Sequence, residues 1–260
     1  GAGKAHRFSK VRDLQEILEY TEDKAQPHQM ADECLNYWKR IWTIHEDDCL
    51  TRPRDWKDWD ALPPISGQDV RSTIRSFKIK TSLGQVNLHP KAMEMISDEG
   101  LEVFAMLLMR CEDRYTWPDE RLYTTLVRLP KPTGGHILIA LINTLVRIWS
   151  RLRRPLSKEW ELQNPSEAFW GSKPGATSTD AAFQHNLTAE VARLQNQESV
   201  SVLIDMYKCF ETIRLAVLMQ HARELNFPLR LIWLLLSVYQ QPRRVRAYGS
   251  CSQAFVSTQG

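Results

Sequence analysis

The sequence has few cysteines, and their arrangement excludes two common uses of this residue. The 260 residues include five cysteines, an odd number, and no two of them form a CxxC pair. A disulfide framework needs paired cysteines, and a structural zinc site needs closely spaced ligands. We therefore expect a protein of a reducing compartment, intracellular and either nuclear or cytoplasmic.

Long apolar runs, repeats and a strong net charge are also missing. The richest apolar run, residues 229–239, is shorter than the roughly 18 residues that cross a bilayer and is interrupted by Arg230. The net charge of +3 neither demands nor excludes a nucleic-acid partner. We expect a soluble globular protein with no membrane partner. The start Gly-Ala-Gly, without a signal peptide, suggests an excised fragment.

Apolar residues recur at helical spacing over much of the chain. The pattern predicts two helices within residues 6–46, a connector over 47–66, and further helices over 69–77, 90–114, 139–154, 178–195, 211–225 and 229–240. Ser178 or Thr179 is the expected N-cap of the helix that ends near Gln195.

Shorter β-prone runs lie between these helices. Residues 123–130 precede the turn sequence KPTGG, Val200–Ile204 is typical of a buried strand that ends at Asp205, and residues 243–248 and 253–257 are β-like. The prediction is an α+β fold, rich in helices, with a small antiparallel sheet.

Asp205 is the first candidate for chemistry, because a strand that ends in a carboxylate can present it to a metal ion. Magnesium prefers hard oxygen ligands, and two-metal phosphoryl transfer needs carboxylates that bridge both ions. One aspartate is not sufficient. A strand end that caps the next helix explains the local pattern at least as well.

Two glycine-bearing loops are candidates for anion binding. Residues 128–135 carry Lys131 and a Gly pair, and residues 170–181 lead into a helix N-terminus, where backbone N–H groups attract anions. The order GxxxxGK[ST] of a P-loop is absent from the first loop. A simple turn and ordinary helix capping explain the two loops equally well.

Basic residues form two groups. Within a first group that also holds Arg153, Arg147, Arg151 and Arg154 share one helix face at spacings of four and three. The second group lies near the end of the chain and consists of Arg243, Arg244 and Arg246. Such a stripe can follow a phosphate backbone, although a solvated helix face is the default explanation.

Taken in order, these blocks resemble the fingers and the first part of the palm of a reverse transcriptase of non-LTR (LINE-type) retrotransposons. The resemblance covers residues 68–260. Its four blocks are Lys80–Pro90, similar to K-x-x-G-x-D-G-x-x-P; Leu129–Pro132 with Ala140–Ile148, similar to IPKPG, RPISLLN and YKI; Gly171–Ala181, similar to GFRxGxSTxDA; and Asp205 with Phe210, similar to motif A, D-x-x-x-x-F.

The resemblance implies a role for each matching residue. Asp205 would be the catalytic aspartate and metal ligand, with the backbone of Met206 beside it, and Phe210 would be the aromatic gate that favours deoxynucleotides. Lys131 would lie near the incoming triphosphate. Lys173 and Gly175 would line the template track, and Arg243, Arg244 and Arg246 would hold template or primer phosphates. The helix stripe adds Arg147 and Arg151 as candidate nucleic-acid contacts.

The same resemblance implies a domain organisation and a reaction. Residues 1–66 would be an N-terminal helical extension and connector, residues 67–198 the fingers, and residues 199–260 a partial palm. The activity would be RNA-directed DNA polymerisation with Mg²⁺, deoxynucleoside triphosphates, an RNA template and a DNA primer. The remaining palm and thumb segments of the same protein would complete the enzyme.

Three positions depart from the family pattern. Ile137 stands where the family has the arginine of RPI, and Asn87 stands where acidic residues are usual. Gly260 stands where motif B would begin, so the later Asp-Asp pair is not in this chain. We therefore expect the chain to be inactive by itself. Two other hypotheses stay open. The chain is a non-catalytic remnant that binds nucleic acid or protein, or it is a helical interaction scaffold built on the tryptophan-rich first 66 residues.

Overall fold

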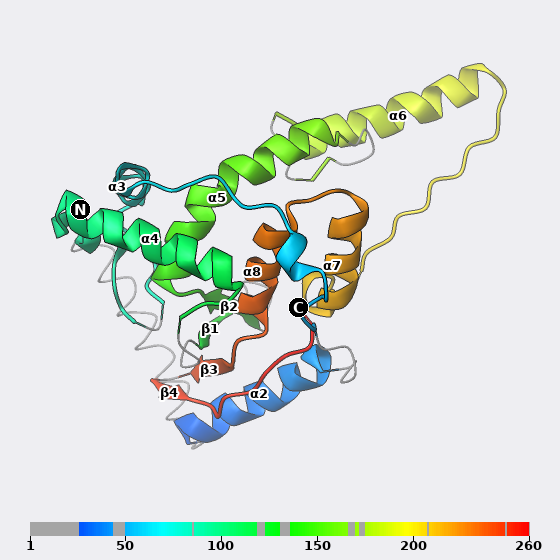
Figure 1. Ribbon diagram of the computed structural model, residues 1–260. Coiled ribbons are helices and arrows are strands. Elements are labelled where there is room, and N and C mark those ends of the chain that lie inside the picture. Colours follow the sequence, from blue (N-terminus) through cyan, green and yellow to red (C-terminus); the bar gives the residue numbers. More distant parts are fainter. Residues whose placement is uncertain are drawn as a thin grey trace. The chain divides into compact units, whose positions relative to one another are not determined.

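The computed structural model describes most of the chain after residue 25 (Figure 1). The described residues are 26–43, 50–84, 86–118, 123–130, 136–165, 170–171, 175–206, 208–247 and 249–259. Contacts divide the chain into two compact units, one of residues 1–157 with 210–260 and one of residues 158–209. Lys131, Lys173 and the helix expected before residue 26 lie outside the described residues.

Helices make up most of the first unit, as the apolar periodicity predicts. They are α2 (Pro27–Trp42), α3 (Gly67–Arg75), α4 (Asp98–Arg114), the first part of α5 (Thr144–Gln163), α7 (Leu215–Glu224) and α8 (Leu229–Tyr239), with short 3₁₀ turns η1 (Trp56–Asp58), η2 (Pro90–Met95) and η3 (Phe210–Thr212). The single helix expected over 90–114 is wrong. It is divided into η2 and α4 because Ser97 caps α4, its Oγ accepting the Gly100 N–H at 3.2 Å.

A four-stranded sheet completes the first unit. Its strands are β1 (Thr124–Pro130), β2 (His136–Leu141), β3 (Arg243–Ala247) and β4 (Ser250–Cys251), in the order β2-β1-β3-β4. The β1–β2 and β3–β4 pairs are antiparallel, but β1 and β3 are parallel. The prediction of an antiparallel sheet is therefore wrong in part, because the long helical connection from β2 to β3 returns the chain beside β1 in the same direction. The helix expected from residue 139 begins only at Thr144.

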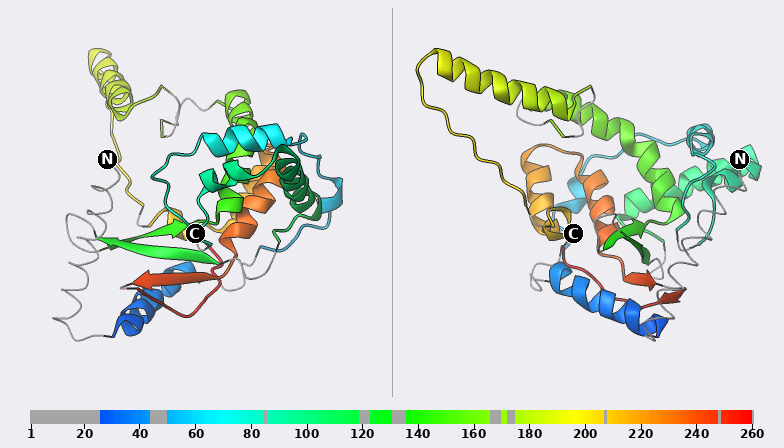
Figure 2. Two further views of the ribbon diagram at one scale, coloured as in Figure 1. Left: turned by 90° about the vertical axis from the view of Figure 1, so that its left-hand side faces the viewer. Right: turned by 180° about the vertical axis from the view of Figure 1, so that it is seen from behind.

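Helix α2 packs on one face of this sheet (Figure 2). A stack of aromatic rings fills the contact. The Trp38 and Trp42 rings lie 5.1 Å apart, and the Trp42 and Phe255 rings lie 5.4 Å apart. These rings cover Leu126 of β1 and Val245 of β3. The stack fixes α2 against two strands that are distant in the sequence. Strand β1 begins more than 80 residues after the end of α2, and β3 lies still farther along the chain.

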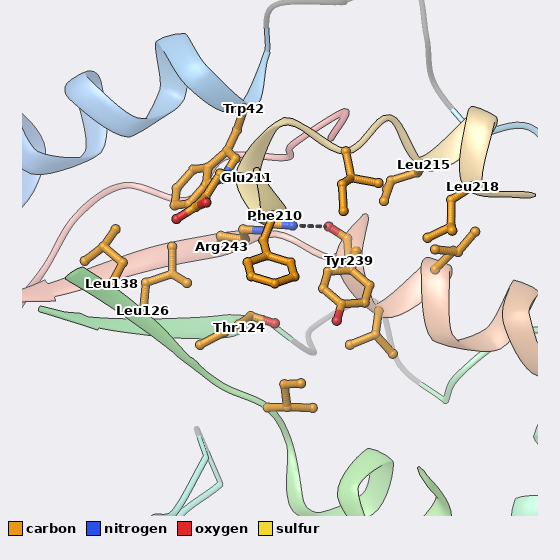
Figure 3. Close-up of a pocket in the computed structure, with 15 residues that line it drawn as sticks. Trp42, Thr124, Leu126, Leu138, Phe210, Glu211, Leu215, Leu218, Tyr239 and Arg243 are labelled. Atoms are coloured by element: carbon orange, nitrogen blue, oxygen red, sulfur yellow. Dashed lines mark hydrogen bonds between the residues drawn. The ribbon is translucent and has the colours of Figure 1, made fainter. Parts of the chain in front are cut away.

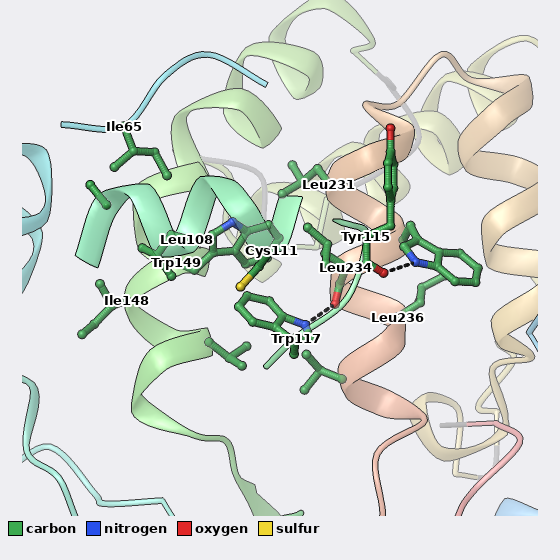
Figure 4. Packing of buried hydrophobic residues seen from close by; sticks show 14 of the residues in the cluster. Ile65, Leu108, Cys111, Tyr115, Trp117, Ile148, Trp149, Leu231, Leu234 and Leu236 are labelled. Atoms are coloured by element: carbon green, nitrogen blue, oxygen red, sulfur yellow. Dashed lines mark hydrogen bonds between the residues drawn. The ribbon is translucent and has the colours of Figure 1, made fainter. Parts of the chain in front are cut away.

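The main hydrophobic core lies between α4, α5 and α8 (Figure 4). Trp117 reaches across this core, and its Nε1–H donates to the backbone oxygen of Leu234 at 3.0 Å. The Trp233 Nε1–H likewise donates to the backbone oxygen of Tyr115 at 2.9 Å. Burying an indole is costly unless its N–H is paired, so these two bonds let large aromatic side chains fill the core and fix α8 beside the end of α4.

One ion pair is buried within this core. Arg153 of α5 donates to both carboxylate oxygens of Glu112 of α4 at 2.6 Å, and Trp149 Nε1–H donates to Glu112 Oε1 at 2.6 Å. The side chains of Arg153 and Glu112 are 5% and 4% exposed. The sequence groups Arg153 with the surface arginines, whereas in the structure its buried ion pair joins α5 to α4.

The second unit contains α6 (Ser178–Leu194). Its N-cap is Thr177 and not Ser178 or Thr179, because Thr177 and Asp180 form a reciprocal capping box at 2.8 and 3.2 Å. The hydrogen bonds from Thr177 lower the pKa of Asp180. The helix itself begins and ends close to the predicted residues.

The buried strand expected over Val200–Ile204 is wrong. This segment is extended without strand pairing, and its apolar residues are highly exposed: Val200 by 90%, Val202 by 76%, Leu203 by 93% and Ile204 by 81%. A β-prone run becomes a strand only when another backbone satisfies its N–H and C=O groups, and this requirement is not visible in the run itself. None of the helices in the described ranges has the length and hydropathy of a membrane span.

Candidate nucleic-acid interface

Three arginines of α5 gather around one buried ring. Arg147, Arg151 and Arg154 line an open cavity of about 310 Å³ together with Phe77, Ile142 and Ser150. We call this site the Phe77 groove. The predicted helix face is therefore present, and the structure adds that the loop after α3 forms the opposite wall.

The groove holds two guanidinium groups in fixed positions. The Arg151 guanidinium lies 3.8 Å from the centre of the Phe77 ring and donates to Ser76 Oγ at 2.9 Å. The Arg147 guanidinium lies 5.8 Å from the same ring and donates to the backbone oxygen of Ser82. Phe77 is only 3% exposed, so the ring is a rigid support for both cations.

The groove is strongly positive. Partial burial and the neighbouring charge of Arg151 lower the pKa of Arg147. Among the ion pairs of the described residues, none includes Arg147, Arg151 or Arg154. Like charges that lie close together repel, and an anion bound between them would remove that repulsion. The arrangement is suited to phosphate, which arginine binds through two parallel N–H groups.

The loop that follows Phe77, residues 78–90, is anchored to the start of α5. Thr144 Oγ1 donates to Leu88 O at 2.6 Å, and Arg147 donates to Ser82 O. Gly84 lies so close to the chain at Ile142 that a Cβ atom would be 2.6 Å from the Ile142 oxygen. Only glycine fits there, because the neighbour is backbone and not a movable side chain.

Replacement of Gly84 by alanine should displace this loop. We expect Gly84→Ala to lower the free energy of unfolding by about 1–3 kcal/mol, the usual cost of forcing extra volume into a packed site. Urea denaturation followed by tryptophan fluorescence measures this change. Gly100→Ala is the matched control, because its Cβ would meet side-chain atoms and no backbone, Ile96 Cγ2 at 2.6 Å and Ser97 Oγ at 3.5 Å, and alanine favours the helix there. Equal stability of the two variants would contradict the close packing at Gly84.

Phe210 lies in the first unit beside a second, mainly apolar cavity of about 300 Å³ (Figure 3). It begins η3 and is 81% exposed, and Glu211 follows it at the cavity wall. The other walls come from α2, β1, β2, α7, α8 and β3.

Arg243 is built into the wall of this cavity. Its guanidinium lies 5.1 Å from the centre of the Trp42 ring and donates to Tyr239 O at 3.0 Å (Figure 3). Burial lowers its pKa to about 10. The side chain therefore faces the interior of the unit, where it helps to fix α2 and α8 to the sheet.

The next arginines of β3 have different surroundings, because successive side chains point to opposite faces of a strand. Arg244 is half-buried with its guanidinium 4.7 Å from the Tyr123 ring centre, and Arg246 is exposed. Of the three basic residues of this strand, Arg246 presents its charge most fully to solvent.

Asp205 and Met206 belong to the second unit, as does Gly175. Asp205 lies in the exposed extended segment, and Met206 is 65% exposed. Gly175 has a positive φ of 80° and open space around it. Phe210 lies in the other unit, so the structure brings Arg147 and Arg151 together but does not place Asp205 relative to Phe210.

Sequence reasoning missed the partners of the α5 arginines. Phe77 and Ser76 lie some 75 residues before Arg151, and no local pattern connects them. For Arg153 a signal existed: it follows Trp149 by four residues, so the two share the apolar face of the helix, opposite to Arg151. Comparison of the chain with protein-family models gives no match, and comparison with curated protein sequences gives none either.

Proposed function

We propose that the chain is the fingers and partial palm of an RNA-directed DNA polymerase that binds template, primer and deoxynucleotide. The observation that carries this proposal is a contact between two sequence blocks. The block around Gly84 packs directly on the block around Asn143, with a Cβ at Gly84 only 3.2 Å from Asn143 Cα. Gly84 and Asn143 are 59 residues apart in the sequence. Two segments that each resemble the family are thus neighbours in the fold.

The Phe77 groove supports the same proposal. It lies where these two blocks meet, since Arg147 and Thr144 of α5 hold the loop of the first block. A polymerase must hold a polyanion near its catalytic carboxylates, and exposed arginines supply that attraction. Phe210 at the mouth of an open cavity is compatible with contact to a sugar.

The magnesium assignment concerns the complete enzyme only. Magnesium requires near-octahedral oxygen ligation, and within the described ranges no three Asp, Glu, His or Cys side chains gather as a metal-binding group. Asp205 by itself supplies one carboxylate, so the described residues do not form a complete magnesium site.

Primer extension tests the proposal. The protein expressed from its whole reading frame should extend a DNA primer on an RNA template with magnesium, and Asp205→Ala should abolish this activity while RNA binding persists. Glu198→Ala is the matched control, since it removes another exposed carboxylate seven residues upstream. Activity that survives Asp205→Ala unchanged would refute the role of Asp205.

A non-catalytic, nucleic-acid-binding remnant is the second candidate, and Ile137 favours it. This residue is 37% exposed on the edge strand β2, where the family's arginine would supply a charge to a triphosphate. The remnant would bind RNA with a strong salt dependence and show no extension even when complete. Gain of extension activity by Ile137→Arg would decide against it.

A further inference from the structure

The Phe77 groove has the properties of a preorganised anion clamp. The contacts of the described residues use one N–H of the Arg147 guanidinium and one of the Arg151 guanidinium. A guanidinium carries five N–H donors, so most of them remain for a ligand. The buried Phe77 ring and the two serine contacts hold both groups in place before any ligand arrives, which reduces the entropy lost on binding.

The length of the arginine row indicates what kind of anion fits. Arg147 and Arg154 are seven residues apart on one helix, or about 10 Å at 1.5 Å per residue. This exceeds the size of a single phosphate group, so a row of phosphates matches the three arginines better than one isolated anion does. Lys78 and Lys80 are exposed on the loop that runs from Ser76 to Ser82, and they add two positive charges to that loop.

We propose that the Phe77 groove binds consecutive phosphate groups of a single-stranded RNA, with Arg147 and Arg151 as the two fixed contacts and Arg154 as a third. The choice of RNA over a free anion rests on the proposed function above. The positive row and its rigid support come from the geometry of the groove and do not depend on catalysis.

Fluorescence anisotropy of the 260-residue chain with a labelled 20-nucleotide RNA tests this site. The KCl concentration is varied from about 50 to about 250 mM, a range that brackets physiological ionic strength. We expect Arg147→Gln and Arg151→Gln each to weaken binding about tenfold. A double variant should lower the salt slope by about 1.4, because each phosphate contact on a single strand contributes about 0.7. Arg110→Gln is the matched control, an exposed arginine of α4 outside the groove.

A second pair of variants leaves the arginines and their ring contacts intact. Ser150 lines the groove, so Ser150→Glu places a negative charge among the arginines, whereas Ser150→Gln adds similar volume without charge. We expect Ser150→Glu to weaken RNA binding about tenfold and Ser150→Gln to weaken it less than twofold. Thermal melts by circular dichroism verify that each variant is folded.

The outcomes separate the groove from the polymerase. RNA affinity and salt slope of the arginine variants within twofold of Arg110→Gln would overturn the groove, whatever primer extension shows. Loss of RNA affinity in these variants would support the groove even if the complete protein extends no primer. Saturable binding of inorganic pyrophosphate that the arginine variants abolish, with RNA binding unchanged, would also overturn it, because the site would then serve a free anion.

Discussion

Glu112→Ala should lower the free energy of unfolding by about 3–5 kcal/mol, the largest effect that we expect from a single charge in this chain. The change leaves the Arg153 side chain, which is 5% exposed, without its two carboxylate contacts, and it also removes the acceptor of Trp149 Nε1–H. A buried charge without a partner keeps its full desolvation cost. Urea denaturation followed by tryptophan fluorescence measures the loss.

The matched control for Glu112 is another glutamate with the same pair distance. Glu190 meets Arg193 at 2.6 Å as well, but their side chains are 52% and 73% exposed. We expect Glu190→Ala to change stability by less than about 1 kcal/mol, because solvent screens exposed pairs. Glu112→Leu combined with Arg153→Met should recover much of the stability lost in Glu112→Ala. Similar losses for Glu112→Ala and Glu190→Ala would contradict the burial of the pair between α4 and α5.

Leu234→Ala should lower the free energy of unfolding by about 2–5 kcal/mol, since the side chain is fully buried in the main core. The loss has two parts: the burial free energy that the removed carbon atoms no longer contribute, and the cost of the cavity that they leave. The backbone oxygen that accepts the Trp117 Nε1–H is unaffected, so the change reports side-chain packing alone. Helix α8 also lines the cavity beside Phe210, so weaker packing of α8 should also affect the wall of that cavity.

Two further leucine variants test the origin of that loss. Leu162→Ala removes the same atoms from a helical side chain that is 82% exposed, and it should cost less than about 0.5 kcal/mol. Leu234→Met keeps the volume and should cost less than about 1.5 kcal/mol. If Leu234→Ala is as mild as Leu162→Ala, then α8 does not occupy the core position described here.

The sequence by itself determined most helices of the described residues and the basic face of α5. Apolar spacing located α2, α7 and α8 within a few residues, because a helix satisfies its backbone groups locally. The same local geometry predicted that Arg147, Arg151 and Arg154 share one face. The four blocks that resemble the reverse transcriptase family also came from the sequence alone.

Only the tertiary structure decided which of these residues meet. The parallel pairing of β1 with β3 and the absence of strand pairing at Val200–Ile204 depend on partners far away in the chain, which no local pattern specifies. The same reason applies to Arg151, which finds Ser76 across 75 residues, and to Arg153, which is buried against Glu112 across 41 residues. Two arginines that are two residues apart thus have opposite roles, because helix geometry sets their directions and only packing decides what lies in each direction.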